Sequence, residues 1–303
     1  MQRKEFLATA LAAIAAGNVL GAAGGPAQSA AASVEAPAPA AALTIRQLID
    51  LIQKDIPGAP FSKTVDTIKS GDADQPVKGI VTTMFATDAV IEKTIRAGAN
   101  FIIAHEPTFY NHLDETEWLD GDPVYAYKKA LLEKNGIVVW RFHDGWHEHR
   151  PDGILMGVLT AMGWDKYYNA GAPEMITIPA ISLGDIVDKA RRQLSIGKMQ
   201  LIGDLSQSCQ RILLSPGAAG GRSHIADLRK YTPDLFICGE VNEWETSEYI
   251  RDARYQGKHM SLLVLGHSVS EEPGMAGLVP WLQQKAPGIR IEHIPSGSPF
   301  TTI

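Results

Sequence analysis

The sequence predicts an α/β protein with largely parallel sheets. Short runs of β-branched and apolar residues alternate with longer segments whose apolar residues recur at helical spacing, and this alternation is typical of strand–helix–strand units. Polar residues of the catalytic type follow several predicted strands at the point where each strand ends. The chain has 303 residues, of which 45% are hydrophobic and 20% are charged, a composition typical of a folded protein with one or two cores.

The first 33 residues have the layout of an export signal, with a basic start, an apolar Ala/Leu stretch and a run of small residues. Arg3-Lys4-Glu5-Phe6-Leu7 is similar to a weakened twin-arginine signal, and an ordinary secretory signal or an uncleaved anchor are the alternatives. Residues 34–42 are rich in Pro and Ala and predict an extended linker. We therefore expect an exported, periplasmic protein whose folded part begins near Leu43.

Charge and cysteine content exclude several classes of protein. The net charge of -6 provides no basic surface for phosphate backbones, so we expect a small-molecule partner and no nucleic acid. The two cysteines, Cys209 and Cys238, flank apolar runs and are expected to be buried thiols rather than a disulfide. After the signal, no apolar run reaches the ~18 residues that span a bilayer.

The predicted elements begin with an amphipathic helix that Thr44 caps and that stops at Pro57-Gly58. The rest of the first half then reads, in order, as a strand at 79–85, a helix at 87–98, a strand at 100–104, a helix at 124–135, a strand at 136–142 and a loop at 143–153. The second half reads as a helix at 181–194, a strand at 211–215, a glycine-rich turn at 217–221, a helix at 223–230, a strand at 234–238, a helix at 243–256, a strand at 261–266 and a helix at 276–285.

Imidazole and carboxylate side chains follow these strands. Ligands gather beyond the carboxyl ends of parallel strands, because loops there present side chains to one point. Histidine nitrogen and carboxylate oxygen together suit Zn, Mn, Fe or Ni. The sequence therefore predicts a metal site in which the ligands are His105, Glu106, His147, His267 and Glu271.

Three motifs have other interpretations. His143-Asp144-Gly145-Trp146-His147 is similar to the metalloprotease pattern H-E-x-x-H, but it follows a strand, contains Gly and has Asp at its second position. The segment 216–223 is similar to a phosphate-binding loop, although Pro216 replaces the first Gly and Arg222 replaces the Lys, so we expect a backbone turn with some anion affinity. A thiol nucleophile is disfavoured, since no histidine that could act as its base lies near either cysteine in sequence.

The order of these motifs resembles the Nif-three-like dinuclear metal-centre family, often labelled GTP cyclohydrolase 1 type 2. The resemblance covers roughly 43–282 and rests on the strand 100–104 running into His105-Glu106-Pro107, on His143-x3-His147, on the glycine-rich turn at 217–221, on Cys238-Gly239-Glu240 and on Gly266-His267-x3-Glu271. Glu106 stands where the family has a second His, and His147 where it has Asp, so three imidazoles and two carboxylates are retained.

The resemblance implies two divalent metal ions between two α/β lobes, and a toroidal hexamer. One lobe would comprise 43–170 plus 258–303 and carry the metal ligands, and the other would comprise 171–257. The working hypothesis is a hydrolase. Because metal would occupy the five ligands, a proton carrier must come from elsewhere, and Glu240, His143 and His149 are the candidates, in that order. The alternative is a non-catalytic metal-binding or scaffold protein.

Overall fold

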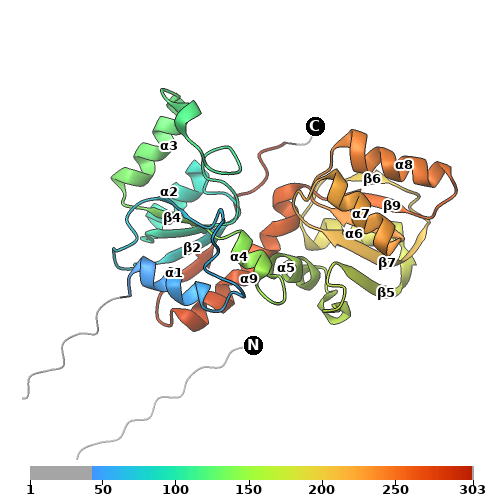
Figure 1. Cartoon of the computed structure of the whole chain (residues 1–303), viewed down its shortest axis with the longest axis horizontal. Helices are drawn as coiled ribbons and strands as arrows, with labels where there is room; N and C mark the ends of the chain where they lie inside the picture. The colour runs from blue at the N-terminus through green and yellow to red at the C-terminus, as the bar shows by residue number, and fades with distance from the viewer. Residues whose placement is uncertain (1–42, 302–303) are drawn as a thin grey trace, which may run out of the picture. The chain divides into compact units, whose positions relative to one another are not determined.

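The computed structural model describes residues 43–301, and it confirms the α/β class with two mixed sheets (Figure 1). The predicted export signal (1–33) and linker (34–42) lie outside the described residues. Nine α-helices occur within 43–301: α1 Ile45–Gln53, α2 Asp88–Arg96, α3 Pro123–Lys134, α4 Asp144–Glu148, α5 Gly153–Ala161, α6 Leu183–Gln193, α7 Gly221–Tyr231, α8 Glu248–Tyr255 and α9 His267–Lys285. In this part of the chain no helix is both long and apolar enough to span a bilayer.

The ten strands that the structure describes form two five-stranded sheets. In chain order they are β1 Ile68–Ser70, β2 Ile80–Thr83, β3 Phe101–Ala104, β4 Val138–Arg141, β5 Met175–Ser182, β6 Gln200–Ile202, β7 Ser208–Ser215, β8 Leu235–Cys238, β9 Ser261–Val264 and β10 Ile291–His293. Strands β1, β5, β6 and β10 and helix α5 were not expected, because their sequences are short or lack a clear apolar period.

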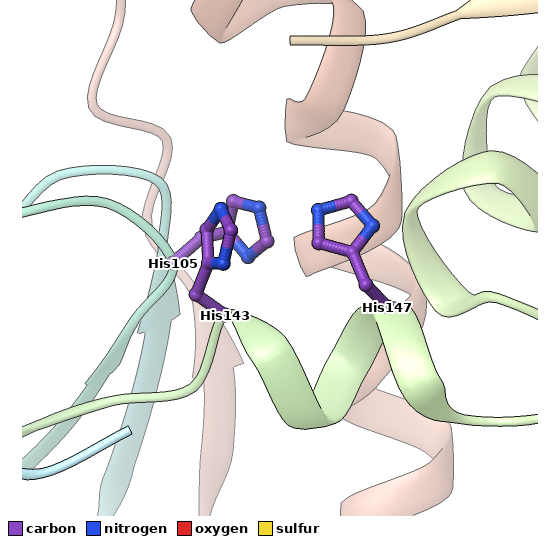
Figure 2. A group of neighbouring side chains, drawn as sticks. All are labelled: His105, His143 and His147. Atoms are coloured by element: carbon purple, nitrogen blue, oxygen red, sulfur yellow. The ribbon is translucent and has the colours of Figure 1, made fainter. Parts of the chain in front are cut away.

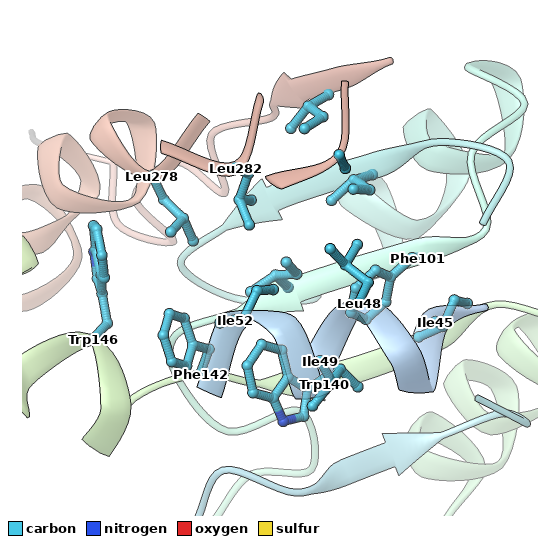
Figure 3. Close-up of a cluster of buried hydrophobic side chains, with 14 of the residues drawn as sticks. Ile45, Leu48, Ile49, Ile52, Phe101, Trp140, Phe142, Trp146, Leu278 and Leu282 are labelled. Carbon is cyan, nitrogen blue, oxygen red and sulfur yellow. The ribbon is translucent and has the colours of Figure 1, made fainter. Parts of the chain in front are cut away.

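The first sheet has the order β1-β4-β3-β2-β10, with β1 antiparallel and the other pairings parallel. Side chains alternate between its two faces: Phe101 and Ile103 join the core under α1 and α9, whereas Ile102 and Ala104 join the core under α2 and α3. Figure 3 shows α1 laid along the strands with its apolar stripe facing them. Every residue of β2, β3 and β4 is buried, and burial of both faces explains why β3 is continuously apolar.

Thr44 fixes the start of α1. Its hydroxyl accepts a hydrogen bond from the Gln47 amide, and the Gln47 side chain accepts one from the Thr44 amide, which completes a capping box. The helix ends at Gln53, four residues before the predicted stop at Pro57.

The second sheet has the order β5-β7-β8-β9-β6, in which β7, β8 and β9 are parallel and the two edge strands are antiparallel. We expected the first lobe to include all of 258–303, but β9 lies in this second sheet. Its four buried residues pair in parallel with β8, beginning with Ser261 opposite Leu235. The chain returns to the first sheet only through α9, which leads to β10.

Helices α5 and α9 pack closely against each other and link the two cores. A Cβ placed on Gly157 of α5 would lie 2.3 Å from the Gly274 backbone of α9, so the helices meet through glycines. Ile154 of α5 joins the core of the first sheet, whereas Leu155 and Val158 of the same helix join that of the second. This contact determines where the residues on α9 stand relative to both sheets.

Two expectations about helices were wrong. The segment 143–153, expected to be a loop, contains α4, and α9 begins at His267 rather than near Ala276. Proline normally ends a helix because it lacks an amide hydrogen. Here α9 continues through Pro273 and Pro280, and the tertiary contacts of Met275, Leu278 and Leu282 with the core stabilise it.

We predict that Gly157→Ala destabilises the fold by about 1–3 kcal/mol, because its methyl group would force α5 and α9 apart. The matched control is Gly277→Ala on α9, where an added Cβ meets nothing within 4 Å. That change should be neutral or stabilising through better helix propensity. Urea unfolding would measure both, and equal stability of the two variants would contradict the close packing.

Candidate metal centre

His105 and Glu106 follow β3 directly and are both buried. The Nδ1 atom of His105 lies 3.3 Å from the carbonyl oxygen of Phe142. Since a carbonyl only accepts hydrogen bonds, this contact places the proton on Nδ1 and leaves Nε2 as an electron-pair donor. That nitrogen lies 3.6 Å from Oε2 of Glu271.

Arg141, at the end of β4, holds this strand end in place. Its fully buried guanidinium donates to the carbonyl oxygens of His105, at 3.0 Å, and His112, at 2.5 Å. It also donates to Oε2 of Glu106 at 3.4 Å. The other carboxylate oxygen of Glu106 is left to face the site.

Helix α4 brings His143 and His147 to the same side as His105 (Figure 2). The two residues are four apart, and one helical turn stacks such side chains on one face. The ring centroid of His105 lies 4.6 Å from that of His143 and 5.1 Å from that of His147. The centroids of His143 and His147 are 4.9 Å apart. The helix removes one objection to a protease-like pattern, but Asp144 still stands where that pattern needs Glu.

Two carboxylates outside the cluster orient α4. Asp66 accepts hydrogen bonds from the backbone amides of His143, Asp144 and Gly145, at 2.8, 2.9 and 2.7 Å. Asp152 accepts from two amides that begin α5, and its second oxygen lies 3.0 Å from Nδ1 of His147. Asp66 therefore fixes the backbone at the start of α4, and Asp152 fixes the direction of the His147 ring. Sequence reasoning missed both residues, which no motif marks.

The first turns of α9 contribute His267 and Glu271, which are one helical turn apart. Nε2 of His267 lies 3.3 Å from Oε1 of Glu106 and 3.1 Å from Oε2 of Glu271. Its Nδ1 atom lies 3.5 Å from Oε1 of Glu240, whose side chain is 57% exposed. All five predicted ligands thus converge, and Glu240 borders the group from the end of β8.

The glycine-rich turn supports Glu271. Gly217 has φ of +72°, and a Cβ there would lie 2.2 Å from Oε1 of Glu271, so only glycine allows the carboxylate to fit. The Gly217 amide donates to the Ser270 hydroxyl at 2.9 Å. The expected backbone turn is present, and its Gly217 allows the Glu271 side chain to pack closely against the backbone.

Burial and neighbouring charge shift the acidity of the cluster. Burial lowers the pKa of His105 well below its usual value, and the adjacent His147 and His143 lower it further. Burial also opposes the charged form of His267, but hydrogen bonds to Glu106 and Glu271 outweigh it and raise the pKa to about 10. Burial would raise the pKa of Glu106, yet His267, His143 and Arg141 hold it below its usual range.

The donor atoms form two overlapping groups that could each hold a metal ion. One consists of His105, His143 and His147, and the other of His105, Glu106 and Glu271; within each, the ligand atoms lie within 4.8 Å of one another. Among the described residues, the buried Nε2 of His105 has no hydrogen-bond partner, and Oε2 of Glu271, which lies 3.1 Å from Nε2 of His267, is its nearest carboxylate oxygen at 3.6 Å. Unpaired buried polar atoms are costly, and a divalent cation is the partner that a neutral imidazole and a carboxylate share, so these residues fit a metal.

His143 and His149, two of the predicted proton carriers, lie in different surroundings. His143 belongs to the three-imidazole group, with Nε2 3.7 Å from Glu106 and Nδ1 2.9 Å from Asp144. His149 packs against Trp146 and Trp281, at 4.9 and 5.6 Å between ring centroids, and its Nδ1 donates to the Pro151 carbonyl.

Both cysteines are free thiols and buried, as expected. Burial, with a smaller contribution from Asp234, raises the pKa of Cys209 to about 11. Burial and Glu240 raise that of Cys238 to about 12. Neither thiol has the lowered pKa of a reactive nucleophile.

A sequence model of the family described as Duf34/NIF3 (NGG1p interacting factor 3) matches residues 43–299. The chain belongs to the DUF34/NIF3 family. The resemblance on which the fold expectation rested is therefore confirmed, and it covers nearly all of the described residues.

Relatives of this DUF34/NIF3 chain agree with that assignment. An Escherichia coli K12 protein named GTP cyclohydrolase 1 type 2 homolog is 26% identical over 243 residues, covering 78% of this chain and 92% of its own length. A hypothetical protein of Staphylococcus aureus superposes with a TM-score of 0.68 at 19% identity, over 86% of this chain and all of its own. A Bacillus cereus protein related to NIF3 gives 0.67 at 14% identity, over 86% and 99%. These likenesses show a shared fold.

We predict that Asp66→Ala lowers the free energy of unfolding by about 2–3 kcal/mol, because three amides at the start of α4 lose their acceptor. Asp188→Ala, which removes an exposed carboxylate paired with Arg191, is the control and should cost at most about 0.5 kcal/mol. Thermal and urea unfolding would measure both. A loss at Asp66 no larger than the control would contradict its role in holding α4.

Proposed function

We propose that this chain is a metal-dependent hydrolase that holds two divalent cations in the cluster at the ends of β3, β4 and β9. The observation that carries the proposal is the convergence of four imidazoles and two carboxylates from three separate parts of the chain. Among the described residues, the buried Nε2 of His105 has no hydrogen-bond partner. Zn, Mn, Fe and Ni all suit this mixture of nitrogen and oxygen donors.

The proposed ligand set includes His143, which the sequence analysis gave as a candidate proton carrier. His105, Glu106, His147, His267 and Glu271 are retained, and His143 joins them because its ring stacks on that of His105. One half of the site is then rich in imidazole and the other in carboxylate. Two full negative charges from Glu106 and Glu271 offset part of the charge of two dications.

Divalent cations in such sites polarise a carbonyl or phosphoryl oxygen and activate water for attack on it. Glu240 is the proposed proton carrier, since its carboxylate is exposed yet only 3.5 Å from Nδ1 of His267. Its exposure allows exchange of the proton with solvent. Arg141 and Asp152 would act by orienting Glu106 and His147, and the proposed substrate is a small molecule.

The first test is metal content. The full chain, purified and loaded with Zn or Mn, should contain two equivalents by elemental analysis, and His105→Ala should lose both because His105 belongs to both ligand groups. His259→Ala, which removes an exposed histidine outside the cluster, is the control and should keep two. Absence of bound metal in the wild-type chain would refute the site.

The second test is turnover. The metal-loaded chain should hydrolyse at least one member of a panel of esters, amides, lactams and phosphoesters, and Glu240→Gln should slow that reaction without loss of metal. Two bound metals without any hydrolysis would favour the alternative, a non-catalytic metal-binding or scaffold protein. Export to the periplasm and hexamer formation stay predictions from the sequence and from the family resemblance.

Asp152→Asn should weaken metal binding by about 10–100-fold, because the imidazole of His147 loses its carboxylate partner. Stability should hardly change, since Asn caps a helix as well as Asp does and α5 keeps its N-cap. Titration with a metal buffer would measure affinity. Asp122→Asn, which alters the cap of α3 instead, should leave the affinity unchanged.

A further inference from the structure

A pocket of about 680 Å³ opens beside Glu106, between the loop after β3, helix α3 and the segment 296–299. Phe85 and Tyr110 supply aromatic walls, and Glu106 itself lines one side. The volume suits a ligand of one or two rings. A molecule in this pocket would lie directly against the proposed metal centre.

The buried ammonium of Lys128 on α3 distinguishes this pocket. Lys128 is only 6% exposed, and its Nζ donates to the carbonyl oxygen of Thr108 at 3.1 Å. It lies 4.6 Å from the centre of the Tyr110 ring, whose backbone adopts a left-handed φ of 67°. A lysine is rarely buried without an anionic partner. The hydrogen bond to Thr108 occupies one of its three donors.

Thr108 supplies a second polar atom at the same place. It is 1% exposed, and among the described residues its hydroxyl oxygen has no hydrogen-bond partner. Burying an unpaired hydroxyl is costly, so a ligand that accepts its hydrogen bond would recover that cost. Burial lowers the pKa of Lys128, and the nearby carboxylates of Asp88 and Asp114 oppose this shift without cancelling it.

Two neighbouring pockets lack this combination. The pocket of about 650 Å³ at His147 is lined by the carboxylates of Glu174 and Asp227, and its Arg150 is already paired with Glu148 at 2.6 Å. The pocket of about 580 Å³ at His267 contains Glu240, and its Lys198 is exposed. Of the three, only the pocket beside Glu106 has a buried cation.

We propose that this pocket binds a planar, aromatic substrate through an anionic oxygen group, a carboxylate or a phosphate, that Lys128 and Thr108 receive. The ring packs on Phe85 and Tyr110, and the rest of the molecule reaches toward Glu106. This inference rests on the proposed function for its catalytic meaning. The binding site itself depends on residues outside the ligand set.

The test measures binding to the full, metal-loaded chain by calorimetry. Phenylphosphonate and benzoate are the anionic probes, and benzyl alcohol is the neutral comparison. We expect at least one anionic probe to bind and the alcohol to bind more weakly. Lys128→Met, which keeps an unbranched apolar side chain but removes the ammonium group, should weaken binding of the anion by ~tenfold or more. Lys129→Met changes the next residue, which is exposed, and should leave the affinity unchanged.

Thr108→Val preserves the shape of its side chain and should weaken binding of the anion several-fold. This variant tests the proposal if Lys128→Met does not fold. No binding of either anion to the wild-type chain, or unchanged affinity in a folded variant at Lys128 or Thr108, would overturn the proposal.

Repeating the titration after removal of the metal with a chelator separates this proposal from that of the metal centre. Binding that needs metal but not Lys128 overturns this one alone, whereas Lys128-dependent binding by a chain that takes up no metal supports it and overturns the metal centre.

Discussion

The burial of two carboxylates beside each other is the constraint on which the rest of the site depends. Glu106 and Glu271 are both almost inaccessible to water, and like charges brought together in a poorly hydrated place repel strongly. Positive charge must therefore be present on every side. Arg141 faces one oxygen of Glu106, and His267 lies between the two carboxylates. In the proposed metal centre, a bound cation would take the place of the imidazole proton beside these carboxylates.

Helix α9 makes this arrangement possible, because one rigid element serves both the site and the core. His267 and Glu271 lie in its first turns, whereas Leu278 and Leu282 pack under the first sheet about two turns later. Its contact with α5 through Gly157 and Gly274 then holds the second core close. His267 and Glu271, the proposed ligands on this helix, are positioned by packing, so their geometry does not rely on flexible loops.

Much of this was predictable from local sequence. Strands β2, β3, β4, β8 and β9 are short apolar runs, and their ends could be read to within a few residues. His105, Glu106, His267 and Glu271 were found because each follows such a run. By contrast, α4 is a five-residue helix that contains glycine, and α9 contains two prolines, so propensity alone favoured a loop and a later start. Contacts with Asp66 and with the core override propensity in both places.

The sequence by itself determined the α/β class, the family and the identity of the polar residues at the strand ends, because these depend on apolar periodicity and on residues close together in the chain. Only the tertiary structure decided that β9 belongs to the second sheet, that His143 stacks on His105, and that Asp66, Asp152 and Gly217 hold the cluster in place. Apart from Asp152 and His147, which are five positions apart, those relations join residues that are distant in the sequence, and no local pattern encodes them. They follow from which buried surfaces meet once the chain is packed.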